Sequence, residues 1–290
     1  METKMNDIYQ LATEVRSNFS DTIRALSKVT ISGHIADNNG HILDNFNGTL
    51  SPTIFDKKSI ATTLANDPNS SPLNFEVQKS ILFKGYNTIK NGQFSFSFYI
   101  PKDIDYTYGN GKISYYANSS NQDGSGAFTE FIIGGTDTNG VNDKEGPVID
   151  LYLNDENFVN GGIVESSPTL IAKIKDNYGI NTTGNGIGHD ITAILDNATS
   201  SPIILNDFYQ TDRDSFNSGT IRYNLESLSV GKHNLSVRAW DINNNYSSKP
   251  FNRFVENMSV IQGRMENKYA STRYPVNAGA LAGKPYDATN

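Results

Sequence analysis

The clearest structural signal in this sequence is the strict alternation at residues 93–100, QFSFSFYI. Three phenylalanines and an isoleucine share one side of this stretch when it is extended, because successive side chains of a β-strand point to opposite faces. Small polar residues and one tyrosine occupy the other side. This period-two pattern is typical of a strand with one buried face, so it predicts a sheet that packs against an aromatic core.

The same alternation recurs on both sides of this stretch. The chain has 290 residues, a length that suits about two domains of roughly 100–150 residues each. Several short strands separated by turns are typical of sandwiches, so we expect a mostly β protein with two immunoglobulin-like antiparallel β-sandwich domains. The expected strands are 29–35, 48–55, 80–85, 112–117 and 128–133 in the first half, and 147–153, 169–175, 190–195, 219–224 and 233–240 in the second.

A stretch rich in Gly, Asn, Asp and Thr separates the two sets of strands and predicts a linker at residues 136–147. The first sandwich is then expected at residues 28–135 and the second at 148–255. After residue 255 the alternation disappears and small residues are common, so 256–290 is expected to be a tail without a sandwich pattern of its own.

The first 27 residues carry a different pattern, which predicts a short N-terminal helix. Their apolar residues recur at helical spacing, and Asp7 is suitably placed to cap a helix. A second short helical turn is expected at residues 20–26. The apolar residues that carry the first helix are Ile8, Leu11, Ala12, Val15 and Phe19.

Composition excludes several functions. The formal net charge is −7 and no basic cluster is present, which argues against nucleic acid as a partner. No apolar run is long enough to cross a bilayer, and residues 1–7 lack the apolar core of a secretory signal. The chain has no cysteine, so disulfides, thiolate metal sites and a cysteine nucleophile are excluded.

Longer stretches occur in an order that is similar to one protein family. They are SDTIRALSKV (20–29), FNGTL (46–50), PTIFDK (52–57), PKDIDY (101–106), GKISYYA (111–117), GPVIDLYLND (146–155), GNGIGHD (184–190) and AWD (239–241). Together they resemble the C-terminal region of the PorU family of type IX secretion system sortases from Bacteroidota, which is itself similar to gingipain-family cysteine peptidases. The resemblance runs from about Asp21 to Ser248.

This resemblance implies a surface protein with a partner. Such sortases lie on the outer face of the outer membrane, remove the C-terminal sorting domain from secreted cargo, and work with a PorV-like outer-membrane β-barrel. Their Cys and His catalytic residues belong to a domain that precedes the region matched here. The chain is therefore expected to be a non-catalytic C-terminal portion, with residues 1–27 following a missing peptidase domain, that positions the peptidase or docks the partner and cargo. The alternative is an extracellular adhesion or carbohydrate-binding sandwich module, which a set of tyrosines at 106, 108, 115 and 116 could serve.

Acidic and amide side chains suggest a calcium site. Asp241, Asn243 and Asn245 place oxygen donors at alternate positions after an expected strand, and Asp143, Glu145 and Asp176 are further carboxylates near strand ends. Calcium prefers six to eight oxygen ligands. A polar turn explains the same residues without a metal, because Asp and Asn favour turns, and the segment lacks the Gly and the distal Glu of an EF-hand loop.

Two further patterns have simpler explanations. The glycines of residues 184–188 could cradle a phosphate, but the flanking sequence does not predict the required strand and helix, so a turn is expected. His189 beside Asp190 could suggest a catalytic pair, yet neighbours on a strand point to opposite faces.

Overall fold

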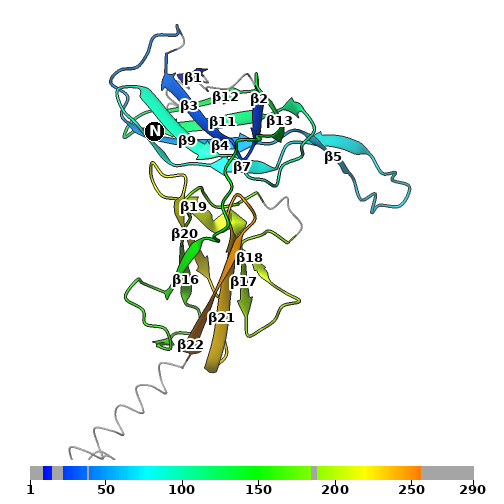
Figure 1. The fold of residues 1–290 in the computed structure, drawn as a ribbon, viewed down its shortest axis with the longest axis vertical. Coiled ribbons are helices and arrows are strands. Elements are labelled where there is room, and N and C mark those ends of the chain that lie inside the picture. The colour runs from blue at the N-terminus through cyan, green and yellow to red at the C-terminus, as the bar shows by residue number, and fades with distance from the viewer. Residues whose placement is uncertain (1–8, 15–21, 38, 184–187, 256–290) are drawn as a thin grey trace, which may run out of the picture.

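The computed structural model describes residues 9–14, 22–37, 39–183 and 188–255. These residues form two β units that lie one above the other in Figure 1, and they contain no α-helix. The N-terminal unit holds one buried apolar cluster, from Ile23 to Ile133, and the C-terminal unit holds a second, from Ile149 to Phe251. Within this part of the chain no helix is long and apolar enough to cross a membrane.

The N-terminal unit is built around an eight-stranded sheet with the order β7-β4-β11-β12-β1-β3-β9, in which β8 also pairs with β4. Its pairings are antiparallel except that of β1 with β12. A three-stranded sheet has the order β10-β13-β2. The strands are β1 (Tyr9–Glu14), β2 (Thr22–Ala25), β3 (Lys28–Ile35), β4 (Gly48–Phe55), β7 (Ile81–Lys84), β8 (Asn87–Ile89), β9 (Gln93–Tyr99), β10 (Gly109–Asn110), β11 (Lys112–Asn118), β12 (Asp123–Phe128) and β13 (Ile132–Thr136).

The alternation at residues 93–100 forms the centre of this unit, as the sequence predicts. Phe94, Phe96 and Phe98 of β9 are buried, whereas Ser95 is exposed. Phe83 of β7 stacks on Phe98 with ring centroids 4.4 Å apart. Because β7 and β9 stand at opposite ends of the strand order, this contact means that the sheet folds over on itself and encloses one aromatic core.

Close packing between β4 and β11 provides a test of how these two strands are paired. A Cβ added at Gly48 would lie 2.0 Å from the carbonyl oxygen of Asn118 on β11, and a backbone atom cannot rotate away. We expect Gly48→Ala to lower the free energy of unfolding by about 2–3 kcal/mol, in the range for overpacked sites, as measured by urea denaturation. Gly40→Ala is the control: nothing lies within 4 Å of its added Cβ, and only its φ of 84° opposes the change, at about 1 kcal/mol. Equal losses for the two variants would contradict the pairing of β4 with β11.

The C-terminal unit is a two-layer sandwich. One sheet has the order β14-β16-β20-β19 and the other the order β15-β22-β21-β17-β18. Both contribute to the same core, for example Leu170 and Ile221 from the first sheet and Val237 from the second. The elements are β14 (Val148–Leu153), β15 (Ile163–Val164), β16 (Thr169–Lys175), β17 (Thr192–Leu195), β18 (Ile203–Ile204), the 3-10 turn η1 (Asn206–Phe208), β19 (Tyr209–Thr211), β20 (Ser218–Asn224), β21 (Gly231–Trp240) and β22 (Tyr246–Val255).

The predicted N-terminal helix is wrong where the structure can test it. Residues 9–14, which include Leu11 and Ala12, form strand β1, whose backbone pairs with β3 and β12. Ile8, Val15 and Phe19 lie outside the described residues. The predicted turn at 20–26 is strand β2 from Thr22 to Ala25. Its burial alternates, with Ile23 and Ala25 buried, and four residues are too few to separate the two periodicities.

A two-stranded arm projects from the N-terminal unit. It consists of β5 (Ser59–Thr62) and β6 (Asn74–Val77), and Figure 1 shows it extending sideways from the sheets. The arm exposes four apolar side chains to solvent: Ile60, Leu64, Leu73 and Phe75. Exposed apolar side chains gathered on one element are a feature of contact surfaces.

Candidate functional site at the joint between the units

The turn after β21 holds the connecting segment 137–147 in place. Asp241 organises this turn, because one of its carboxylate oxygens accepts hydrogen bonds from the backbone N–H groups of Asn243 and Asn245, at 2.9 and 2.7 Å. The two asparagines then reach the connecting segment. The Asn243 amide donates to the carbonyl of Val141 at 2.8 Å, and the Asn245 amide donates to the carbonyl of Asp143 at 3.1 Å.

Three carboxylates meet at this point. One oxygen from each of Asp143, Asp176 and Asp241 lies within 4.8 Å of the others. Asp143 comes from the connecting segment, Asp176 directly follows β16, and Asp241 directly follows β21. Residues from three separate parts of the chain therefore place negative charge in one small volume.

Burial makes this charge costly. Asp241 is fully buried and Asp176 is 7% exposed. Loss of solvation raises the pKa of Asp241 to about 6, against the lowering effect of its hydrogen bonds from Asn245. Burial also raises the pKa of Asp176, and the nearby charges of Asp143 and Glu145 raise it further. Such an arrangement favours either proton uptake or a bound cation.

The structure places the predicted calcium residues as follows. Asp241 belongs to the carboxylate group, and Asn243 is bonded to Asp241 through its backbone N–H. The Asn245 side chain supports the group, because its amide donates to the second Asp241 oxygen at 2.7 Å. Asp143 and Asp176, which the sequence singles out only as separate strand-end carboxylates, complete the group.

A second carboxylate, Asp103, joins the two units directly. It lies in the N-terminal unit after β9, with its side chain 12% exposed. One oxygen accepts a hydrogen bond from the Asn244 amide at 2.6 Å. The other contacts the Asn181 amide at 2.9 Å and His189 Nδ1 at 2.5 Å. All three partners belong to the C-terminal unit, so one largely shielded carboxylate collects donors from two of its loops, the β16–β17 connection and the β21–β22 turn.

A second contact between the two units involves Asp214 of the C-terminal unit. Its carboxylate accepts hydrogen bonds from the backbone N–H and the hydroxyl of Thr88, each at 2.6 Å, and its own N–H donates to the Tyr86 carbonyl. Arg213 donates to the Tyr86 hydroxyl at 2.8 Å and lies over the Tyr86 ring. The two units are thus joined at separated places by charge-assisted hydrogen bonds, which are the stronger class.

Two histidines of the C-terminal unit bond aspartates, and one of them, His189, reaches the other unit. His189 bonds Asp103 and stacks beside Trp240 with ring centroids 4.3 Å apart, so it forms no hydrogen-bonded pair with Asp190. His233 lies between Asp196 and Ser229, an arrangement similar to a catalytic triad. However, His233 Nε2 lies 2.8 Å from the Ser229 carbonyl, which can only accept a proton, and 3.4 Å from the Ser229 hydroxyl. The nitrogen that would act as the base therefore donates to the carbonyl instead.

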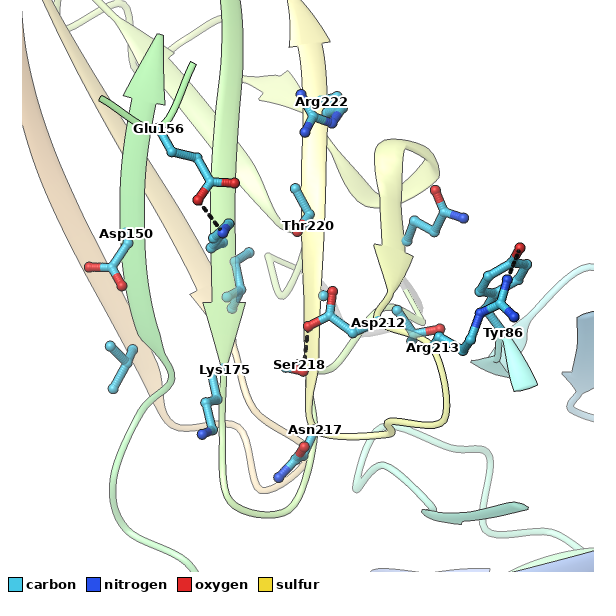
Figure 2. Close-up of a pocket in the computed structure, with 16 residues that line it drawn as sticks. Tyr86, Asp150, Glu156, Lys175, Asp212, Arg213, Asn217, Ser218, Thr220 and Arg222 are labelled. Atoms are coloured by element: carbon cyan, nitrogen blue, oxygen red, sulfur yellow. Dashed lines mark hydrogen bonds and ion pairs between the residues drawn. The ribbon is translucent and has the colours of Figure 1, made fainter. Parts of the chain in front are cut away.

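A groove with a volume of about 770 Å³ lies on the outer face of the β14-β16-β20-β19 sheet. Figure 2 shows two of its charged side chains hydrogen-bonded to neighbouring hydroxyl groups, Arg213 to Tyr86 and Asp212 to Ser218. Glu156 likewise accepts a hydrogen bond from Lys173 at 2.6 Å. Four charged side chains of the groove are therefore held by neighbouring side chains.

Burial removes one of the four tyrosines considered for a binding surface. Tyr115 is buried in the core of the N-terminal unit, and Tyr116, the next residue of β11, is exposed on the other face. Tyr106 and Tyr108 are also exposed, and their hydroxyls bond the Lys102 carbonyl and the Arg24 guanidinium.

Comparison with known proteins gives one informative similarity. No family model matches the chain, and no curated protein matches it significantly. Among solved structures, dimeric latent PorU from Porphyromonas gingivalis is 28% identical over 82% of this chain and 22% of its own length, with a TM-score of 0.46. Trypsin-activated α2-macroglobulin from Escherichia coli is 9% identical over 85% of this chain and 18% of its own, with a TM-score of 0.26, too low to indicate a shared fold or function. The chain is therefore similar to a portion of PorU, and it spans less than a quarter of that protein's length.

Proposed function

We propose that this chain is a non-catalytic portion of a PorU-like sortase of the type IX secretion system. Its two immunoglobulin-like sandwiches act as a stiff support for a neighbouring gingipain-like cysteine-peptidase domain on the cell surface. The observation that carries this proposal is the joint between the units, in which Asp103 and Asp214 each collect donors from the opposite unit. An interface that is held by contacts at two separate places keeps the two units in one relative orientation, whereas a single flexible connection would let them move as a hinge.

The chemistry of the chain agrees with a supporting role. It has no cysteine, so it holds no cysteine nucleophile, and His189 and His233 are engaged in hydrogen bonds to aspartates. The ordered stretches from SDTIRALSKV to AWD are similar to the same family as the 28%-identical structure. A PorV-like β-barrel and cargo with C-terminal sorting domains are the partners that this proposal includes.

The test uses the full-length parent protein in its own outer membrane. We expect the double variant Asp103→Ala/Asp214→Ala to lower cargo processing and surface attachment about tenfold or more, because a misplaced catalytic group loses its alignment with a large substrate. Hydrolysis of a short soluble peptide should be unchanged, because the peptidase domain itself is intact. Processing of cargo at the normal rate by a variant with a demonstrably loosened joint would contradict the supporting role.

The exposed arm favours docking as a second candidate function. Its four apolar side chains are exposed, on an arm that extends sideways from the sheets (Figure 1), and we propose the PorV-like barrel as their contact. Replacing Ile60 and Phe75 with serine should leave folding intact, because both are exposed, while reducing co-purification of the barrel. Normal co-purification would assign docking to another surface and leave only the supporting role.

A further inference from the structure

The carboxylate group at the joint is an uncompensated negative site. Asp143, Asp176 and Asp241 bring three formal negative charges within 4.8 Å, and two of these residues are more than nine-tenths buried. Among the residues that the structure describes, no lysine, arginine or histidine forms an ion pair with any of them. Buried like charges at this separation repel strongly in a medium of low dielectric constant.

A second and independent observation concerns the atoms around this group. Asp143 Oδ2 and Asn243 Oδ1 are buried from solvent, and neither has a hydrogen-bond partner in the described part of the chain. The Asp176 carboxylate receives its two backbone hydrogen bonds, from Tyr178 and Gly179, on a single oxygen. Native proteins rarely leave buried polar atoms unsatisfied, and such atoms indicate a missing water or ion.

The unsatisfied atoms are all acceptors. Carboxylate oxygens accept only, and so does the oxygen of an amide. Asn243 is held beside the group, because its N–H donates to Asp241 and its amide donates to Val141, two residues before Asp143. One proton shared between two carboxylates would leave the remaining oxygens unsatisfied, whereas a single cation would satisfy several at once.

We propose that this joint binds a calcium ion through Asp143, Asp176, Asp241 and Asn243, with water or backbone carbonyls completing its coordination. The ligands are oxygens only, which favours Ca²⁺ over Zn²⁺. They come from three separate segments of the chain, which suits the flexible coordination of Ca²⁺ better than the strict octahedron of Mg²⁺. The ion links the connecting segment 137–147 to the ends of β16 and β21, which belong to different sheets. It therefore holds in place the segment that connects the N-terminal unit to the C-terminal unit. This inference does not depend on the PorU-like role.

Purified chain treated with a chelator and then titrated with CaCl₂ provides the test. At the affinity usual for extracellular calcium modules, saturating CaCl₂ should raise the melting temperature by about 5–10 °C. NaCl at equal ionic strength should not, because charge screening alone is non-specific. Tb³⁺ is a second probe: Trp240 is the only tryptophan and directly precedes Asp241, so excitation of the indole should sensitise Tb³⁺ emission, and CaCl₂ should displace it.

Asp143→Asn distinguishes a metal site from an ordinary acidic turn. Its new Nδ2 would stand where the unpartnered Oδ2 lies and could donate to Asp176 or Asp241, while its Oδ1 keeps the bonds from Lys144 and Glu145. Without metal we therefore expect this variant to melt above the native chain, and CaCl₂ to raise its melting temperature by less than half the native shift. Asp150→Asn, at an exposed strand position with the same change of charge, should behave as the native chain does.

The possible results of these measurements distinguish a calcium site from an ordinary acidic turn. A calcium-dependent rise in melting temperature that Asp143→Asn removes and Asp150→Asn retains supports the site. An absence of both the thermal shift and the Tb³⁺ emission overturns it, as does an equal calcium response in all three proteins. Should Asp143→Asn fail to fold, Asp176→Asn with the Tb³⁺ measurement replaces it. The calcium test does not measure cargo processing. Its result is therefore independent of whether the supporting role is correct.

Discussion

Phe98→Ala is expected to lower the free energy of unfolding by about 3–5 kcal/mol, the cost usual for removing a buried phenylalanine. Phe98 is 1% exposed and stacks against Phe83 at 4.4 Å and Phe96 at 6.1 Å. Phe83 comes from the far end of the same sheet, so the variant removes the contact that closes the sheet around its core. Urea denaturation followed by far-UV circular dichroism measures the loss.

Phe75→Ala is the matched control for Phe98→Ala. It removes the same side chain from the exposed arm, where 45% of the residue is accessible. A surface change of this kind usually costs less than about 0.5 kcal/mol. Similar losses for the two variants would show that the core of the N-terminal unit is not organised around β9.

Asp103→Ala is expected to lower the free energy of unfolding by about 3 kcal/mol, because it leaves one buried donor, Asn181, and two partly buried donors without their charged acceptor. The affected donors are Asn181, His189 and Asn244, all in the opposite unit. His189 also packs on Trp240 at 4.3 Å. Emission from Trp240 should therefore shift to longer wavelength as the released joint admits water.

Asp44→Ala is the control for Asp103→Ala, because Asp44 is an exposed aspartate of the same unit. It should change neither stability nor the tryptophan emission. Unchanged Trp240 emission in Asp103→Ala, together with unchanged stability, would contradict the claim that this carboxylate holds the units together. A loss of stability without the spectral shift would place the damage inside the N-terminal unit.

Much of the sheet structure is predictable because alternation and burial coincide. Residues 48–55 and 169–175 form β4 and β16 as expected, and 93–100 corresponds closely to β9. Strands with little apolar alternation escaped prediction. β12 reads DGSGAF and β6 reads NFEV, and each forms by pairing its backbone with a neighbour rather than by burying a regular apolar face. The same reason explains β1, where sheet pairing outweighs the helical spacing of Leu11 and Ala12.

The joint was predictable only in part. The oxygen-rich turn at Asp241 and Asn243 is visible in the sequence, as are Asp143 and Asp176, but their separation along the chain gives no reason to place them together. The sequence gives no indication of the contacts of Asp103, because its partners Asn181, His189 and Asn244 lie about 80 to 140 residues away. Trp240 is half-buried beside His189. Long-range contacts of this kind are set by how the two units dock.

The central claim is that the two units are held in one fixed arrangement. The chain has no cysteine, so Gln93→Cys and Lys249→Cys, one exposed position in each unit, can be spin-labelled without background. We expect double electron–electron resonance to give a single narrow distance distribution, which broadens when Asp103→Ala and Asp214→Ala are added. A broad distribution in the otherwise native chain saturated with CaCl₂ would contradict the account.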